Sequence, residues 1–273
     1  MIRITSVEKE PTHEIVYQFP ETGGRITRGR LEIFRALATG IPEILRALIV
    51  MSDLQGREHS LADSGKERRL LGEVVAEELS FLCEMGELPP SDSIGVVLAG
   101  DLFVVPDLDK RGGKGDVRGI WQLLAKKFRW VAGTAGNHDR FDSDSTDGGV
   151  RFSEPNIYYL DGDLVGVDGL KLGGVAGVIG NPSKPFRREE TRFLGALKTV
   201  TAQIPDLLIL HEGPCGHSPD RPGNDAIRGI LERTPRTLVV CGHNHWQQHE
   251  PDELVNGTQV LNADGKVYVV MGS

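Results

Sequence analysis

The chain has 273 residues, of which 39% are hydrophobic and 26% charged, a balance typical of globular proteins that fold without disulfides or a membrane. Its formal net charge of −8 argues against broad electrostatic binding of nucleic acid, which depends on clustered Lys and Arg. The three cysteines are widely spaced, and neither a signal peptide nor a membrane-spanning run is visible, so we expect a cytoplasmic protein with reduced thiols and no membrane association.

Strand-like and helix-like segments alternate along the chain. Short runs rich in Val, Ile and Leu predict buried strands at 46–52, 94–99, 128–133, 206–210 and 236–241. Apolar residues at helical spacing predict helices around 70–82, 117–124, 193–200 and 227–231, the last with Asn224 as its N-cap. This alternation predicts an α/β architecture.

Two regions differ from this pattern. Residues 1–45 precede the first predicted central strand, and we interpret them as an N-terminal extension packed on a main domain of residues 46–273. Residues 157–181 and 253–271 contain short apolar runs separated by Asp-Gly or Gly-Gly, which are hairpin signals. These two stretches therefore predict a second, more antiparallel portion.

Polar side chains that bind metals follow the predicted strands, at the point where each strand ends. In an open α/β sheet the carboxyl ends of the strands face the ligand crevice, so these distant segments can converge on one site. Their carboxylate, amide and imidazole groups suit Mn, Fe, Zn, Co or Ni, and the adjacent glycines permit close approach of the chain. The candidate ligands are Asp53, Asp101, Asn137, His211, His243 and His245.

Four sequence blocks resemble the ordered signature of a known family. They are Gly-Asp at 100–101, Gly-Asn-His-Asp at 136–139, a histidine after a buried strand at 211, and Gly-His-Asn-His at 242–245. Their order and strand context resemble the calcineurin-like metallophosphoesterases. The resemblance implies a four-layer αββα sandwich and a metal-dependent hydrolase that cleaves a phosphomonoester or phosphodiester with metal-activated water.

The resemblance also implies a role for each residue. Asp101 would bridge two divalent metal ions, which in such sites lie about 3.5–4 Å apart and activate a hydroxide nucleophile. His138 would protonate the leaving group, and Arg140, directly after this block, would contact a substrate phosphate unless it is an ordinary surface arginine. The first metal would be bound by Asp53 and His245, and the second by Asn137, His211 and His243.

The sequence departs from the family pattern at two positions. The first block is normally Asp-x-His, but Gln55 stands where the histidine is expected, so the first metal would have an amide oxygen as a weaker ligand. Some family members place an acidic residue three positions after the bridging aspartate to orient the catalytic histidine, and here that position is Val104. These departures predict a loosely held first metal and a different orienting partner for His138.

The expected substrate is a phosphorylated small molecule or a nucleotide; nucleic acid is disfavoured by the net charge unless the basic runs 110–118 and 184–192 flank the cleft. An alternative from another class is a metal-binding scaffold with little or no turnover and a regulatory or binding role. The departures at Gln55 and Val104 favour this alternative, whereas the intact blocks at 136–139 and 242–245 oppose it. Nothing in the sequence indicates an oligomeric state.

Overall fold

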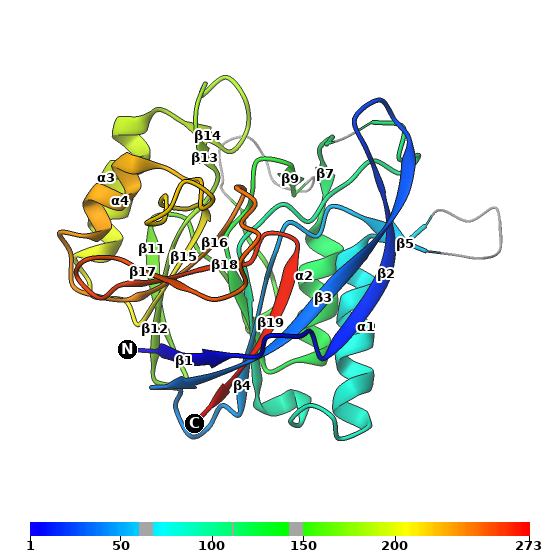
Figure 1. Ribbon diagram of the computed structural model, residues 1–273, viewed down its shortest axis with the longest axis horizontal. Helices are drawn as coiled ribbons and strands as arrows, with labels where there is room; N and C mark the ends of the chain where they lie inside the picture. Colours follow the sequence, from blue (N-terminus) through cyan, green and yellow to red (C-terminus); the bar gives the residue numbers. More distant parts are fainter. Residues whose placement is uncertain (60–67, 111, 142–149) are drawn as a thin grey trace.

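The computed structural model describes residues 1–59, 68–110, 112–141 and 150–273. These residues form an α/β structure with a nine-stranded sheet, a six-stranded sheet and two small two-stranded sheets (Figure 1). The helices are α1 (Leu71–Glu84), α2 (Arg118–Lys127), α3 (Glu190–Thr201) and α4 (Asp225–Leu231), with a 3-10 helix η1 (Ser91–Ser93). The strands are β1 (Arg3–Val7), β2 (His13–Pro20), β3 (Ile26–Thr39), β4 (Ala47–Ser52), β5 (Arg57–Glu58), β6 (Ile94–Leu98), β7 (Gly115–Asp116), β8 (Trp130–Gly133), β9 (Asp139–Arg140), β10 (Ile157–Tyr159), β11 (Asp163–Val167), β12 (Leu170–Val175), β13 (Val178–Ile179), β14 (Arg187–Arg188), β15 (Leu207–Glu212), β16 (Leu238–Gly242), β17 (Asp252–Glu253), β18 (Gln259–Asn262) and β19 (Lys266–Gly272).

The two large sheets each contain a run of parallel strands. The nine-stranded sheet has the order β10-β8-β6-β4-β19-β3-β2-β5, with β1 paired to β3, and its strands β4, β6, β8 and β10 are parallel. The six-stranded sheet has the order β11-β12-β15-β16-β18-β17, and its strands β12, β15, β16 and β18 are parallel. Each run therefore brings the carboxyl ends of its strands to one edge of its sheet.

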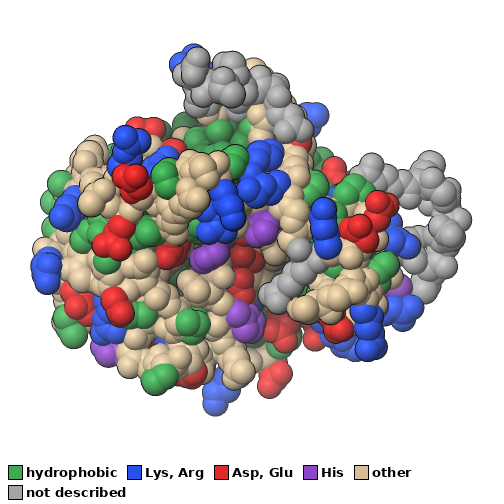
Figure 2. All heavy atoms as spheres, turned by 90° about the horizontal axis from the view of Figure 1, so that it is seen from above, with side chains coloured by type: hydrophobic (Ala, Val, Ile, Leu, Met, Phe, Trp, Pro, Cys, Tyr) green, Lys and Arg blue, Asp and Glu red, His purple; other side chains and the backbone are tan. Residues whose placement is uncertain are grey.

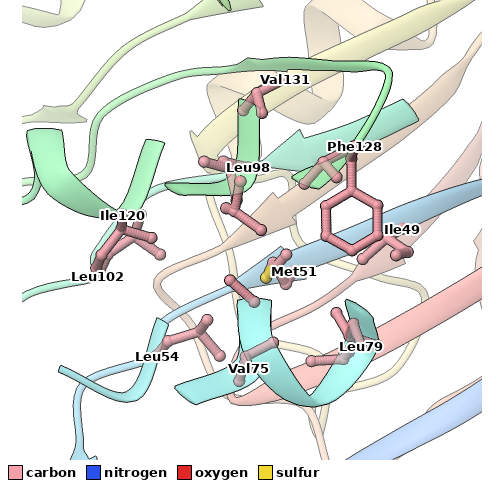
Figure 3. Close-up of a cluster of buried hydrophobic side chains, with 14 of the residues drawn as sticks. Ile49, Met51, Leu54, Val75, Leu79, Leu98, Leu102, Ile120, Phe128 and Val131 are labelled. Carbon is pink, nitrogen blue, oxygen red and sulfur yellow. The ribbon is translucent and has the colours of Figure 1, made fainter. Parts of the chain in front are cut away.

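Side chains alternate between two packing surfaces along the central strands, as the strand period of two requires. On β4, Ile49 and Met51 pack with α1 and α2 in one hydrophobic cluster, which Figure 3 shows, whereas Val50 belongs to another cluster shared with the six-stranded sheet. A third cluster joins α3 and α4 to the opposite face of the six-stranded sheet. Both sheets are thus covered on the outside by helices and packed against each other (Figure 1).

The predicted central strands and helices are confirmed. The strands are β4, β6, β8, β15 and β16, and the helices are α1 to α4, each within a few residues of its predicted bounds. The Asn224 side chain caps α4 by accepting hydrogen bonds from the backbone amides of Ala226 and Ile227. No helix of the described residues has the length and apolar composition needed to cross a bilayer.

Residues 1–45 are mostly strands within the nine-stranded sheet. The long strand β3 pairs in parallel with β19 and in antiparallel fashion with β1 and β2. Its Leu31 and Phe34 are buried on opposite faces, in different hydrophobic clusters. The N-terminal segment is therefore hydrogen-bonded into the sheet that carries β4 and β6.

The predicted separate antiparallel portion is wrong in part. Strands β11 and β12 do form an antiparallel hairpin, but β12 continues into the parallel part of the six-stranded sheet. The C-terminal strand β19 lies inside the other sheet, between β4 and β3. Its Val267 and Tyr268 are fully buried on opposite faces, which is the environment of a central strand and not of an edge hairpin.

Candidate metal centre

The predicted ligands come together where the parallel strands of both sheets end. Asp53 directly follows β4, Asp101 and Asn137 lie in the loops after β6 and β8, His211 is the next-to-last residue of β15, and His243 follows β16. Figure 2 shows histidine and acidic side chains close together near the middle of this face of the molecule. The strand-end pattern in the sequence therefore corresponds to a convergence in space.

Several of these residues lie where the backbone turns sharply. Asp53 and Asp101 both have φ 56°, and His243 has φ 66°, in the left-handed region that residues with a side chain seldom occupy. Each such residue costs on the order of 1 kcal/mol or more, and strain of this kind concentrates at functional sites. The turns place the backbones in close contact, so that a Cβ atom at Gly136 would overlap the Asp101 carboxylate and one at Gly242 would overlap that of Asp53.

The Asp101 carboxylate lies at the centre of the group. Its Oδ1 accepts a hydrogen bond of 2.8 Å from the backbone amide of His138. Its Oδ2 lies 3.2 Å from His211 Nε2, 3.1 Å from Gln55 Nε2 and 3.9 Å from His138 Nε2. The side chain is nearly inaccessible to solvent, so both oxygens are directed to partners within the site.

Two buried polar atoms beside Asp101 have no hydrogen-bond partner of good geometry: Asn137 Oδ1 and His211 Nε2. The His211 ring is fixed by a 2.7 Å hydrogen bond from Nδ1 to the carbonyl of Ala99, which leaves Nε2 facing the Asp101 carboxylate. Buried polar atoms are nearly always satisfied, so these two unsatisfied atoms on candidate ligands are consistent with a bound cation. Asp101, His211 and His243 each offer a ligand atom within 4.8 Å of the others, which fits a divalent transition metal.

Asp53, Gln55 and His245 line a neighbouring pocket of about 730 Å³, together with Asp264 and residues of β2 and β3. Asp53 Oδ2 accepts hydrogen bonds from Ser52 Oγ at 2.6 Å and from the backbone amide of His243 at 3.0 Å. His245 is largely exposed, and its Nδ1 lies 2.7 Å from Asp264 Oδ2, which orients the ring and leaves Nε2 for a ligand. These residues could hold a first metal next to the Asp101 group.

The charges of the site act strongly on one another. Burial raises the pKa of Asp53 well above its usual value, and the nearby Asp264 and Asp101 carboxylates add to the shift. Burial opposes a charge on His211, but Asp101 and Asp53 outweigh it and raise its pKa to about 10. Burial and the neighbouring His211 lower the pKa of His243 to about 4. The carboxylates thus favour a positive charge beside His211, which a bound cation would supply in place of the proton, and His243 is neutral near pH 7, as a metal ligand must be.

His138 is partly exposed at the edge of this group. Its Nδ1 lies 2.6 Å from the carbonyl oxygen of Gly113 and donates to it, so Nε2 faces Asp101. Val104, which stands where some members of the resembled family have an acidic residue, is a buried core residue. The partner of His138 is therefore a backbone carbonyl, which has no signal in the sequence.

Three further residues support the site without having been predicted. The buried Asp139 accepts hydrogen bonds from the backbone amides of Asp101, Leu102 and Gly136, and so ties together the loops after β6 and β8. Ser52 donates a hydrogen bond to Asp53, and Asp264 contacts the ring of His245. Asp264 could have been suspected from its position between two apolar runs near the C-terminus.

Gln55 and Arg140 lie at the site in less direct positions. The Gln55 side chain faces Asp101 with its amide nitrogen and lines the same pocket as Asp53. Arg140 donates a hydrogen bond to the carbonyl of Asp139, and its guanidinium lies 5.8 Å from the centre of the Phe186 ring. Both residues border the predicted metal ligands. Gln55 precedes His138 in the chain, and Arg140 follows it.

Comparison with known proteins adds resemblance to solved structures only. No protein-family model matches the chain, and no curated protein matches it. A hypothetical protein from Thermus thermophilus matches with 17% identity and a TM-score of 0.43, over 79% of this chain and 75% of that one. A protein of unknown function from Aquifex aeolicus matches with 14% identity and a TM-score of 0.34, over 82% of this chain and 95% of that one.

Proposed function

We propose that the protein is a metal-dependent phosphoesterase of the calcineurin-like type, with a four-layer αββα sandwich and two divalent metal ions. The observation that carries the proposal is the group of Asp101, His211 and His243, whose ligand atoms lie within 4.8 Å of one another, together with the buried and unsatisfied His211 Nε2. The fold agrees with the proposed layers, since helices pack on the outer face of each large sheet and the inner faces pack together.

The residues divide into two ligand sets that share Asp101. Asn137, His211 and His243 would hold one ion, and Asp53, His245 and Gln55 the other, in a donor set of oxygen and nitrogen that suits Mn, Fe, Zn, Co or Ni. Two ions of this kind, when bound, supply a hydroxide nucleophile near neutral pH and neutralise charge on the phosphoryl oxygens.

The chain itself supplies orientation and a proton. The carbonyl of Gly113 holds His138 with Nε2 directed toward the reacting group, where a protonated imidazole can donate to the departing oxygen. The carbonyl of Ala99 fixes the His211 ring, and Asp139 fixes the backbone that carries Asp101. These contacts set the geometry before a substrate arrives, which is where much of the rate enhancement of such sites originates.

The proposal is tested by metal analysis combined with turnover. Purified protein, loaded separately with Mn, Zn and Mg, is assayed on an aryl phosphate monoester and an aryl phosphate diester. Asn137→Ala and His211→Ala should each lose bound metal and lose turnover by about two orders of magnitude or more, because each removes a ligand. Asp163→Ala, at an exposed position on β11, is the matched control and should behave like the unmodified chain.

A metal-binding scaffold without turnover is the second candidate, and the Gln55 contact favours it. The amide nitrogen of Gln55 donates to Asp101 Oδ2, so its oxygen is not directed at the shared carboxylate. Metal bound in stoichiometric amount, with no hydrolysis of either ester under any of the three metals, would favour this candidate. Absence of both metal and turnover would contradict both.

A further inference from the structure

A cluster of four basic side chains lies beside the candidate metal centre. Lys114, Arg140, Lys184 and Arg187 come from three separate segments of the chain, on the same side of the molecule as the predicted ligands. Figure 2 shows a group of Lys and Arg side chains directly next to histidine side chains on this face. The basic runs 110–118 and 184–192 thus meet, apart from residue 111, which lies outside the described residues.

One half of the basic cluster is fixed by pairing of β7 with β9. These short parallel strands join Gly115 and Asp116 to Asp139 and Arg140. The backbone amide of Gly115 donates to the carbonyl of His138 at 3.3 Å, and Lys114 directly precedes it. Lys114 and Arg140 therefore lie on two paired backbone segments, both close to the proposed proton donor His138.

The other half is fixed by pairing of β13 with β14. Val178 pairs with Arg187, and the amide of the adjacent Ile179 donates to Glu212 Oε2 at 2.6 Å. Glu212 follows His211, so this contact anchors the segment of Arg187 next to a metal ligand. The two halves meet where the Arg140 guanidinium packs on the ring of Phe186, 5.8 Å from its centre.

The charges of the cluster act on one another and on the site. Partial burial lowers the pKa of Lys114, and the neighbouring Arg140, Arg187 and Lys184 lower it further. Arg187 also contributes to the lowered pKa of His243. Within the part of the chain that the structure describes, Lys114, Lys184 and Arg187 have no carboxylate within 4.0 Å. Nearby Arg188, by contrast, is paired with Asp161.

Three like charges gathered without a carboxylate partner repel one another, which is unexpected in a chain of net charge −8 unless an anion joins them. We infer that the basic cluster of Lys114, Arg140, Lys184 and Arg187 binds a second phosphate group of the substrate, while the metal centre holds the phosphate that is cleaved. The substrate class is then a small organic molecule with two phosphate groups. This inference rests on the proposed phosphoesterase function. Four cations on an acidic protein suit one phosphate group, whereas a nucleic acid strand would need an extended row of basic side chains.

The test compares ligands that differ only in the second phosphate. Binding of propanediol bisphosphate and hexanediol bisphosphate is measured by calorimetry against propyl phosphate and hexyl phosphate, on the protein as purified. At least one bisphosphate should bind about tenfold or more tightly than its monophosphate partner, as charge-assisted hydrogen bonds to one added phosphate would give. In the double variant Lys114→Ala/Arg187→Ala this ratio should fall to near one. Lys9→Ala, in the exposed connection of β1 and β2 at the lower side of Figure 1, should keep the full ratio.

The outcomes separate this inference from the proposed function. If the protein hydrolyses aryl phosphate but binds both bisphosphates no better than the monophosphates, the second-phosphate site is refuted and the phosphoesterase proposal stands. If bisphosphates bind preferentially, and the preference is lost in the double variant, the site stands even where no turnover is found. A short single-stranded oligonucleotide that binds more tightly than either bisphosphate, with the same loss in the double variant, would assign the cluster to nucleic acid and overturn the inference.

Discussion

At the scale of single residues, His138 shows how a contact from the backbone can replace a side-chain partner. Some members of the family that the sequence resembles have an acidic residue at the position of Val104, whereas here the Gly113 carbonyl accepts from His138 Nδ1 at 2.6 Å. A carbonyl that accepts from Nδ1 fixes the orientation of the ring and its tautomer. His138 is therefore well oriented for the proton transfer proposed for it.

His138→Ala should reduce turnover of alkyl phosphates by about 10²–10⁴, the usual contribution of a positioned acid, with metal content nearly unchanged. Aryl phosphates should be slowed less, because their leaving groups depart without a proton. The measurement is kcat on both ester types, with metal analysis of the same preparations. Equal slowing of both types, or loss of metal, would mean that His138 has a structural or ligand role instead.

In the proposed two-metal site, Gln55 decides how the first metal would be held. Its amide nitrogen donates to Asp101 Oδ2 at 3.1 Å, so to bind a metal through oxygen the amide has to rotate. Gln55→His should tighten binding of Zn or Mn, because imidazole is the better ligand, and Gln55→Ala should change affinity little if the amide keeps its contact with Asp101. Titration of both variants against a competing chelator measures this. No tightening in Gln55→His would place this side chain outside the coordination shell.

At the scale of elements, the central strands could be predicted because their residues are apolar on both faces, and the convergence of the candidate ligands because these follow those strands directly. The place of β3 in the sheet could not be predicted: its alternating charged and apolar residues are a strand signal, but its pairing with β19 joins segments more than 200 residues apart in the chain. The same holds for β19, whose neighbours are set by tertiary contacts that no local pattern encodes. Contacts such as that of Gly113 with His138 also leave no signal in the sequence, since any residue has a carbonyl.

The loops after β6 and β8 depend on Asp139, whose carboxylate accepts hydrogen bonds of 2.7 to 2.9 Å from three backbone amides. Asp139→Ala would leave these buried donors without partners, each at a cost of about 1–3 kcal/mol before water enters. We expect the free energy of unfolding to fall by about 3 kcal/mol, with loss of bound metal because Asp101 is displaced. Urea unfolding measures the first effect, and Asp163→Ala is the exposed control. A fall of less than about 1 kcal/mol would show that the loops hold their shape without this residue.

At the scale of the whole molecule, the centre joins the two large sheets. Asp53 and Asp101 follow strands of the nine-stranded sheet, whereas His211 and His243 belong to strand ends of the six-stranded sheet. The hydrogen bond from the His243 amide to Asp53 Oδ2 at 3.0 Å already crosses this boundary. The sheets also meet through the apolar cluster between them and through the hydrogen bonds of the Gln259 side chain to the backbone of Ile4, and a metal at the centre would add to these contacts.

Bound metal should therefore stabilise the fold as one unit. A ligand present at about 100 times its Kd adds about 2.7 kcal/mol to the free energy of unfolding, which for a domain of this size raises Tm by about 5–10 °C. Thermal unfolding with and without Mn or Zn should show this increase as a single cooperative transition, since the ligands span both sheets. Asp101→Asn removes the shared charge and should lose most of the increase, whereas Asp163→Asn on the exposed strand β11 should keep it. An equal rise of Tm in both variants would show that the metal stabilises the protein from some other place on its surface.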